Sequence, residues 1–370
     1  MENQGKELIM YVYNDITTDA RVQRAANALA DDFQLTLIST QKGKNIVDKS
    51  YKNVLVGGYK ITMMDIFASI WTTWRIICKQ RPDIVYCHDY YSAILAYLLL
   101  CTRYSGKIVY DAHELMIPEE GRGDRRLMFF YWFEKRIVKK VDLLVCASKQ
   151  RAEIMQNHYG LKSTPTVVPN ISQLEINDDD LDTSNIISSL DGFFKKEGQT
   201  VVYAGVVTTS RRINELFDAV VATADKCKLL IVGDGDALPS LKQNAVRHPE
   251  LSVAFTGKVP YKCLGSILSR CDIGFLYYPI DTLNNIYCAS NKIYEYASVE
   301  LPMLANENPT VKRILDKEQI GISTGDFKYG LRVLVNESKV YKNNCTIFTK
   351  HNQWKDVAQQ LKQIILSVSR

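Results

Sequence analysis

Two histidine–acid pairs stand at the ends of predicted strands in the first half of the chain. His113 and Glu114 follow one strand, and His88 and Asp89 close the strand before it. Imidazole and carboxylate groups at the carboxyl ends of parallel strands lie where α/β proteins place their active sites. A single histidine in such a place is more often structural, but two at equivalent strand ends favour a function.

The second half carries its candidate chemistry near helix starts. Arg211 and Arg212 follow a strand that ends at Gly205. Guanidinium groups beside the free backbone N–H groups of a helix start suit a diphosphate. An arginine pair on a solvated helix face is the alternative, and the residues alone weigh the two equally.

Another helix is predicted to begin with Ser290, Asn291 and Lys292, with Glu295 one turn further on. Lys292 is close enough to the helix start to reach a phosphate. Glu295 is suited to accept hydrogen bonds from paired hydroxyl groups of a sugar ring. The alternative is an ordinary amphipathic helix with a lysine–glutamate pair on its surface.

The elements that position these residues are short β-rich runs alternating with helical patterns. In the first half, strands are predicted at 8–13, 34–40, 82–88, 107–111, 142–148 and 166–169. In the second half they are predicted at 200–204, 228–232, 252–256, 272–276 and 302–305. Continuous apolar strands such as 84–87 indicate burial on both faces, which is typical of a parallel sheet covered by helices.

The sequence therefore predicts an α/β protein with two doubly wound domains, since 370 residues exceed what one core usually organises. We place the N-terminal domain at 1–170, a polar linker with room for one short helix at 171–199, and the C-terminal domain at 200–350. The last stretch, 351–370, has apolar residues at helical spacing. It either caps the second domain or crosses back to the first.

Composition bears on location and partners. The start of the chain lacks a secretory pattern, and the nine cysteines include no C-x-x-C pair, so we expect a reducing, cytoplasmic setting. The net charge of +5 comes entirely from residues 1–170, which hold 23 Lys/Arg against 18 Asp/Glu. No nucleic-acid recognition module is apparent, so nucleic acid is not an expected partner.

Segment 121–140 combines basic clusters with the bulky apolar run 127–133. Its basic residues are Arg122, Arg125, Arg126, Lys135, Arg136, Lys139 and Lys140. Such a pattern suits the surface of an anionic membrane, and we expect peripheral association with the inner face. The alternative is a helix whose aromatic side packs into the core, and that must account for several of these residues.

Short motifs along nearly the whole chain resemble, in order, those of the family 4 glycosyltransferases, which have the GT-B fold. In the first half they are Asp-Ala-Arg-Val at 19–22, Tyr-Asp-Ala-His-Glu-Leu at 110–115 and Val-Pro-Asn at 168–170. In the second half they are 203–205, 231–235, 255–257 and the run from Tyr294 to Pro302. The resemblance implies two Rossmann-like domains facing each other across a cleft, with the C-terminal helix returning to the first domain.

The resemblance also implies an activity. Family members transfer a sugar from a nucleotide donor with retention of configuration, usually without a metal, so no metal or other cofactor is expected. The donor is expected to be a UDP-sugar, and the acceptor a glycan or lipid-linked hydroxyl in bacterial surface polysaccharide synthesis. The second domain would bind the nucleotide and the first domain the acceptor.

Individual residues follow from matching motif positions. His113 would lie against the reacting sugar as the catalytic residue, and Arg21, His88, Asp89 and Glu114 would contact the acceptor. The donor would meet Gly205, Arg211, Arg212, Lys258, Val259, Ser290, Asn291, Lys292 and Glu295. Among these, Arg211 takes the phosphate position, Lys258 and Val259 the turn at the base, and Glu295 the ribose.

The chain departs from the family pattern at three points. Tyr287 stands where the first acid of the E-x(7)-E motif is expected, Val206 replaces an arginine, and 288–291 replaces a glycine-rich turn. Two other functions stay open. One is a GT-B-like sugar-nucleotide epimerase, and the other is a catalytically silent partner subunit of a transferase, which the missing acid and the missing glycine-rich turn suggest.

Overall fold

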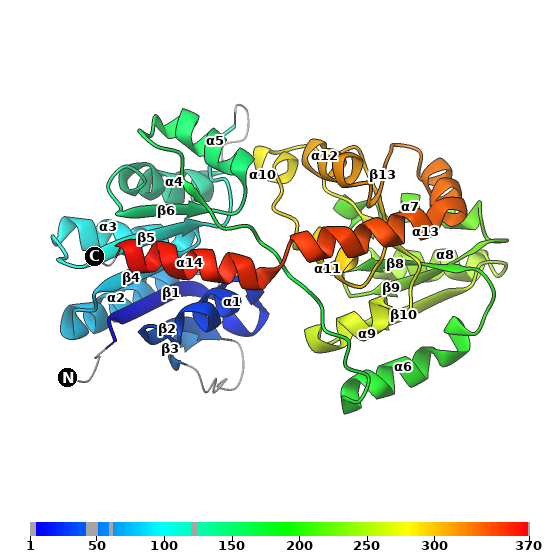
Figure 1. Ribbon diagram of the computed structural model, residues 1–370, viewed down its shortest axis with the longest axis horizontal. Coiled ribbons are helices and arrows are strands. Elements are labelled where there is room, and N and C mark those ends of the chain that lie inside the picture. Colours follow the sequence, from blue (N-terminus) through cyan, green and yellow to red (C-terminus); the bar gives the residue numbers. More distant parts are fainter. Residues whose placement is uncertain (1–4, 42–50, 59–61, 120–123, 369–370) are drawn as a thin grey trace. The chain divides into compact units, whose positions relative to one another are not determined.

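The computed structural model describes residues 5–41, 51–58, 62–119 and 124–368. The chain divides into two compact units (Figure 1). Unit 1 contains Met1–Asn170 and Lys355–Arg370, and unit 2 contains Ile171–Trp354. Each unit is built on one parallel sheet with helices on its faces, so the prediction of two doubly wound α/β sheets is confirmed.

The sheet of unit 1 has the order β3-β2-β1-β4-β5-β6-β7. Its strands are β1 (Glu7–Asp15), β2 (Gln34–Gln41), β3 (Lys52–Gly58), β4 (Ile84–His88), β5 (Lys107–Ala112), β6 (Leu143–Cys146) and β7 (Thr166–Val167). Its helices are α1 (Ala20–Leu29), α2 (Met63–Gln80), α3 (Ala93–Cys101), α4 (Arg125–Ile137), α5 (Lys149–Tyr159) and α14 (Trp354–Val368). The strand order reverses between β1 and β4, which is where such sheets bind ligands, beyond the carboxyl ends of the strands.

The sheet of unit 2 has the order β10-β9-β8-β11-β12-β13. Its strands are β8 (Gln199–Ala204), β9 (Cys227–Val232), β10 (Val253–Gly257), β11 (Ile273–Leu276), β12 (Met303–Ala305) and β13 (Gly321–Ser323). Its helices are α6 (Leu181–Phe194), α7 (Ile213–Val221), α8 (Leu238–Arg247), α9 (Leu264–Leu268), α10 (Leu283–Ile286), α11 (Asn291–Ser298), α12 (Pro309–Glu318) and α13 (Phe327–His351). Here the order reverses between β8 and β11.

The described part of the chain also forms four short 3-10 helices, at Ile16–Thr18, Tyr90–Ser92, Thr209–Arg211 and Tyr261–Cys263. The edge strands β3 and β13 were not predicted from the sequence. None of the helices formed by the described residues is both long enough and apolar enough to cross a lipid bilayer.

Residues 171–199 differ from the expected linker, because they belong to unit 2 and contain the 14-residue helix α6. The Asp180 side chain caps the start of α6 by accepting from the backbone N–H of Thr183. At its other end, the Lys228 ammonium donates to the Phe194 carbonyl at 2.8 Å, where a cation is favoured by the helix dipole. Leu190 and Phe193 pack into the core of unit 2.

The C-terminal segment is grouped with unit 1. Val357, Leu361 and Ile365 form the buried face of α14, and Lys362 pairs with Asp32 beside the end of α1. The long helix α13 extends to His351, so the C-terminal helix begins at Trp354 rather than at 351.

The loops after β8 and β9 cross with their backbones in contact. Gly205 donates its N–H to the Val232 carbonyl at 2.9 Å. A Cβ at Gly233 would lie 1.8 Å from the Gly205 oxygen, and Gly233 has a φ of +144°. Only glycine fits this crossing, which shapes the carboxyl end of β8.

We expect Gly233→Ala to lower the free energy of unfolding by about 3 kcal/mol or more, from backbone strain and overpacking. Gly192 of α6 is the matched control, because nothing lies within 4 Å of an added Cβ there. Gly192→Ala should raise stability by about 0.5–1 kcal/mol through helix propensity. Urea unfolding measures both, and equal effects of the two substitutions would contradict the close crossing.

Candidate functional site

His88, Asp111 and His113 come together at the carboxyl ends of β4 and β5. The parallel register places His88 beside Asp111, and His113 follows directly after β5. His88 Nδ1 lies 3.3 Å from His113 Nε2, and these nitrogens lie 3.5 and 3.6 Å from Asp111 Oδ2. The predicted pairing of the two strand ends is therefore present within unit 1, with Asp111 at its centre.

Arg21, in the first turn of α1, holds Asp111 in place. Its Nε donates to Asp111 Oδ2 at 3.2 Å and its Nη2 donates to Oδ1 at 2.9 Å. A third bond runs from Nη1 to the carbonyl of Val168 at 3.0 Å. Arg21 is predicted to contact the acceptor, whereas in the structure its side chain is 10% exposed and makes these bonds within unit 1.

Burial and charge act in opposite directions on this cluster. Burial opposes ionisation of Asp111, yet the Arg21 guanidinium and His113 hold the pKa of Asp111 well below its ordinary value. Burial lowers the pKa of His88. It also disfavours a charged His113, but the Asp111 carboxylate outweighs it and raises the pKa of His113. His113 is therefore the imidazole that protonates more readily.

The three side chains offer ligand atoms within 4.8 Å of one another, a spacing that permits a metal ion. Both oxygens of Asp111 already accept from Arg21, and a guanidinium at this distance repels a cation. The cluster therefore fits a charge-balanced hydrogen-bond network better than a metal site. The expected independence from metal stays a prediction.

Asp89, directly after β4, has an unusual backbone and an unusual carboxyl group. Its φ and ψ of 65° and 166° lie in a region that few residues other than glycine adopt. Its Oδ1 is buried and has no hydrogen-bond partner among the residues that the structure describes. Burial raises the pKa of Asp89 to about 7, and the nearby Glu114, which is exposed, adds to this shift.

Unit 2 has a cavity of about 190 Å³ at its own switch point, between the ends of β8 and β11. It is lined by Tyr203, Gly205, Val206, Arg211, Phe275, Leu276, Tyr277, Tyr278 and Lys292. Arg211 Nη1 donates to the Tyr277 carbonyl at 2.6 Å, and its guanidinium lies 4.8 Å from the centre of the Tyr278 ring. Two cationic side chains, Arg211 and Lys292, thus face one small cavity.

Lys292, near the start of α11, is half-buried and donates from Nζ to the Ala204 carbonyl. Burial lowers the pKa of Lys292, with Glu295 opposing this effect and Arg211 adding to it. A Cβ at Gly205 would lie 3.0 Å from Nζ, so the glycine gives the ammonium room. A partly desolvated ammonium favours an incoming anion.

The carboxylate of Glu295 is buried at this end of α11. Its Oε1 accepts from Asn291 Nδ2 and from the Tyr261 hydroxyl, both at 2.9 Å. The Ser290 hydroxyl bonds to the Tyr278 hydroxyl at 2.7 Å. Tyr261 and Tyr278 were not predicted, because they reach the helix from loops elsewhere in the sequence.

The remaining predicted donor residues lie apart from the cavity lining. Arg212 has a left-handed backbone (φ 46°) and pairs with Glu215 at 2.7 Å, with 57% of its side chain exposed. Lys258 and Val259 follow β10; Lys258 is exposed, whereas Val259 packs against the core of unit 2.

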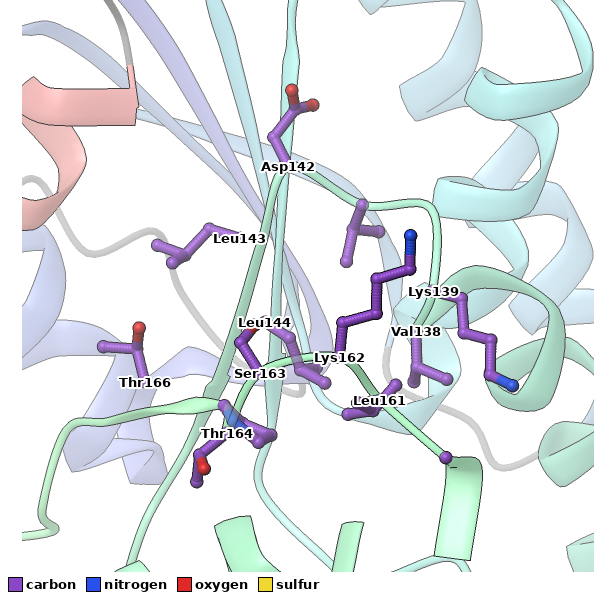
Figure 2. A pocket seen from close by; sticks show the side chains of 13 residues that line it. Val138, Lys139, Asp142, Leu143, Leu144, Leu161, Lys162, Ser163, Thr164 and Thr166 are labelled. Atoms are coloured by element: carbon purple, nitrogen blue, oxygen red, sulfur yellow. The ribbon is translucent and has the colours of Figure 1, made fainter. Parts of the chain in front are cut away.

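A second hollow, of about 440 Å³, lies at the other edge of the sheet of unit 1 (Figure 2). Its lining comprises Val138, Lys139, 141–144 and 160–166, at the amino ends of β6 and β7. His88 and His113 stand at the opposite, carboxyl edge of the same sheet. No predicted site residue lines this hollow, and we assign it no role.

Comparisons with known proteins agree with this architecture. The chain matches the model for glycosyltransferase family 4 over residues 20–173 and the model for glycosyl transferases group 1 over residues 198–331. Together the two matches span well over half of the chain. No curated protein shows significant sequence similarity.

Solved structures resemble the whole chain at low sequence identity. A sucrose-phosphate synthase from Thermosynechococcus elongatus has a TM-score of 0.76 at 14% identity, covering 98% of this chain and 99% of its own. HepE of Anabaena, in complex with UDP-glucose, has a TM-score of 0.73 at 13% identity, covering 98% and 100%. WaaG, a glycosyltransferase involved in lipopolysaccharide biosynthesis, has a TM-score of 0.70 at 12% identity, covering 97% and 99%. At these identities the likeness shows the fold.

The raised pKa of Asp89 should make the free energy of unfolding depend on pH. A carboxyl group whose folded pKa is raised to about 7 costs stability as the pH rises from its unfolded value of about 4. Asn tolerates positive φ and does not ionise. We therefore compare the free energy of unfolding of Asp89→Asn with that of wild type at each pH by urea unfolding. The difference in favour of Asp89→Asn should be larger at pH 8 than at pH 5. The exposed Asp31→Asn is the control, and a pH-independent difference for Asp89→Asn would contradict the prediction.

Proposed function

The chain belongs to the family 4 glycosyltransferases with the GT-B fold, and from this premise we propose that it is a retaining hexosyltransferase. It would move a sugar from a nucleotide-sugar donor, taken as a UDP-sugar, to a glycan or lipid-linked acceptor in bacterial surface polysaccharide synthesis. The observation that carries the proposal is the cavity of unit 2, where Arg211 and Lys292 converge at a sheet switch point.

The donor's diphosphate accounts for both cations. Arg211 and Lys292 are the charges that would stabilise negative charge as the diphosphate leaves, the largest catalytic contribution in such a reaction. Lys292 gains from an anion because its ammonium is partly desolvated, which lowers its pKa. HepE in complex with UDP-glucose, a relative in fold, supports a UDP-sugar as the first donor to test.

The acceptor hydroxyl has a matching group in unit 1. The Oδ1 of Asp89 is buried without a partner among the described residues, and is suited to accept a hydrogen bond from that hydroxyl. His113 would contact the transferred sugar, while His88 and Glu114 lie next to these two groups along the chain. Unit 1 would therefore bind the acceptor and unit 2 the donor.

Retention follows most simply from front-side displacement. The bond between the anomeric carbon and the diphosphate breaks as the acceptor oxygen bonds to the same face, and the leaving phosphate oxygen takes the acceptor proton. A covalent intermediate would need a free carboxylate nucleophile. Asp111 is bound by Arg21, and Glu295 is bound by Tyr261 and Asn291. Asp89, whose Oδ1 has no partner among the described residues, is assigned to the acceptor hydroxyl, so none of the three is left for that role.

Arg211→Gln and Lys292→Gln should each weaken UDP binding about tenfold, because each removes a charge-assisted hydrogen bond. Turnover should fall about 10²-fold as stabilisation of the leaving group is lost. Arg247→Gln, at the end of α8 and outside the cavity lining, is the control. Calorimetry with UDP, GDP and ADP measures affinity, and product assays with each sugar nucleotide measure transfer.

The same assays separate the rival functions. Nucleotide released only when acceptor is present excludes an epimerase. Absence of binding to every nucleoside diphosphate would contradict the transferase proposal and favour a silent partner subunit. Unchanged UDP affinity in Arg211→Gln would contradict its phosphate role.

Membrane association is proposed for the surface shared by α2 and α4. Its exposed apolar side chains are Met64, Phe67, Trp71, Met128 and Trp132. The two helices meet where Phe67 and Phe129 pack edge to face, with ring centres 6.1 Å apart. Phe130 and Ile137 of α4 are buried, so core packing explains part of the predicted segment and leaves the rest exposed. Arg122 lies outside the described residues.

Charge on this surface favours an anionic membrane. Arg125, Lys135 and Arg136 of α4 are exposed, and the Arg136 guanidinium lies 3.2 Å from the centre of the Trp132 ring. Basic groups beside exposed indole rings suit the headgroup region of a bilayer. This would bring a lipid-linked acceptor to unit 1.

Replacing both Trp71 and Trp132 by Ser should weaken flotation with phosphatidylglycerol vesicles about tenfold or more, because two exposed indole groups are lost. Wild-type binding should also fall as salt screens the basic groups. Ile347→Ser removes an equally exposed apolar group from α13 of unit 2 and should have no effect. Wild-type protein that fails to float at low salt would contradict membrane association.

A further inference from the structure

His113 is fixed at two of its atoms by groups from two other elements. Its ring nitrogen Nε2 lies against Asp111, and its main-chain carbonyl accepts from Arg151 Nη1. Arg151, in α5, is itself only 4% exposed. Both the backbone and the ring of His113 are therefore restrained before any substrate is present.

Asp111 is restrained in the same way. Arg21 donates a hydrogen bond to each of its oxygens and a third to the Val168 carbonyl. Tyr86 places its hydroxyl 3.5 Å from Asp111 Oδ2, and its ring stacks on His88 with centres 4.2 Å apart. The carboxylate has one orientation available, and Oδ2 is the oxygen directed at the two imidazoles.

The buried surroundings select a tautomer for each histidine. His88 Nε2 is buried and has no hydrogen-bond partner among the residues that the structure describes. An unbonded N–H there would cost more than a bare nitrogen, so the His88 proton belongs on Nδ1, which faces Asp111 Oδ2 and donates to His113 Nε2 at 3.3 Å. Neutral His113 therefore accepts at Nε2 and carries its own proton on Nδ1. Its Nδ1 is then the ring nitrogen left for a substrate.

We propose that Arg21 and Asp111 are positioning residues for the transfer reaction, which fix the ring orientation and tautomer of His113 and thereby direct its Nδ1 edge at the transferred sugar. This inference rests on the proposed function of His113. It gives Arg21 a role that acts through Asp111 rather than on the acceptor. It also makes Asp111, which the motif analysis left without a role, necessary to the site.

The charges around His113 come from every element that packs on it. Asp111 of β5 favours the imidazolium, as does Asp89 after β4, whereas Arg21 of α1 disfavours it. Neighbouring His88 and the Arg151 guanidinium at the carbonyl complete the set. Removing the Asp111 charge leaves burial and the arginines, so the pKa of His113 should fall.

The test is Asp111→Asn in the full-length protein. The His113 ring is followed by NMR on histidine-labelled protein, with its signal assigned by comparison with His113→Gln. In Asp111→Asn, His113 should titrate at lower pH and its ring nitrogens should show a changed tautomer. Turnover should fall about 10²-fold through misplacement of the sugar contact, while UDP affinity, a property of unit 2, stays unchanged.

Asp142→Asn is the matched control. Asp142 pairs with Lys107 at 3.0 Å at the amino end of the same sheet, far along β5 from Asp111. Its loss removes a carboxylate–cation pair without touching the histidines. It should leave the His113 titration and turnover as in wild type.

Arg21→Lys is a second variant, which keeps the cation but cannot grip both Asp111 oxygens. It tests the positioning role if Asp111→Asn does not fold. We expect smaller changes of the same kind in the His113 titration, its tautomer and turnover. A wild-type His113 titration in a folded variant would overturn the inference, as would loss of UDP affinity together with turnover. If wild-type protein transfers no sugar, the proposed function fails, whereas the NMR titration still tests the positioning pair.

Discussion

The buried ion pair between Arg21 and Asp111 is the constraint on which the site of unit 1 depends. It joins the start of α1, the end of β5 and, through the Val168 carbonyl, the chain just after β7. Burying two charges is costly, and removing one partner of such a pair typically costs about 3–5 kcal/mol because the other is left uncompensated. The two charges therefore stay paired only while β5 and its neighbouring strands keep their register. The positions of the two histidines depend on the same register.

The fold was largely predictable because buried strands have a strong signature. Strand β4 is buried along its whole length, and its continuous apolar sequence predicted this directly. The missed elements carry weaker signals. Strand β13 has only three residues and begins with Gly321, and β3 lies at the edge of its sheet. Helix α6 was underestimated because the acidic run before it resembles a solvated linker, whereas its aspartates cap the helix and pair with Lys262 and Arg270.

The site was predictable only where strand ends determine it. The grouping of His88, Asp89 and His113 was predictable because parallel strands bring their carboxyl ends to one edge of the sheet. Asp111 was overlooked because it lies within the strand, where the sequence gives no sign that an arginine 90 residues earlier reaches it. The divergence of Arg211 and Arg212 is likewise hidden in the sequence. Arg212 has a left-handed backbone and an exposed side chain, whereas the side chain of Arg211 lines the cavity.

Both sheets place an unusual backbone directly after a strand at the switch point, and the difference between the two is informative. After β8 the position is Gly205, which adopts its φ of +146° without a side-chain penalty. After β4 it is Asp89, for which such a conformation costs about 1–3 kcal/mol. Glycine would satisfy the turn after β4 equally well, so the turn itself does not explain an aspartate. What the aspartate adds is a buried carboxyl oxygen beside His113, and this strained residue is therefore better explained by its chemistry than by the fold.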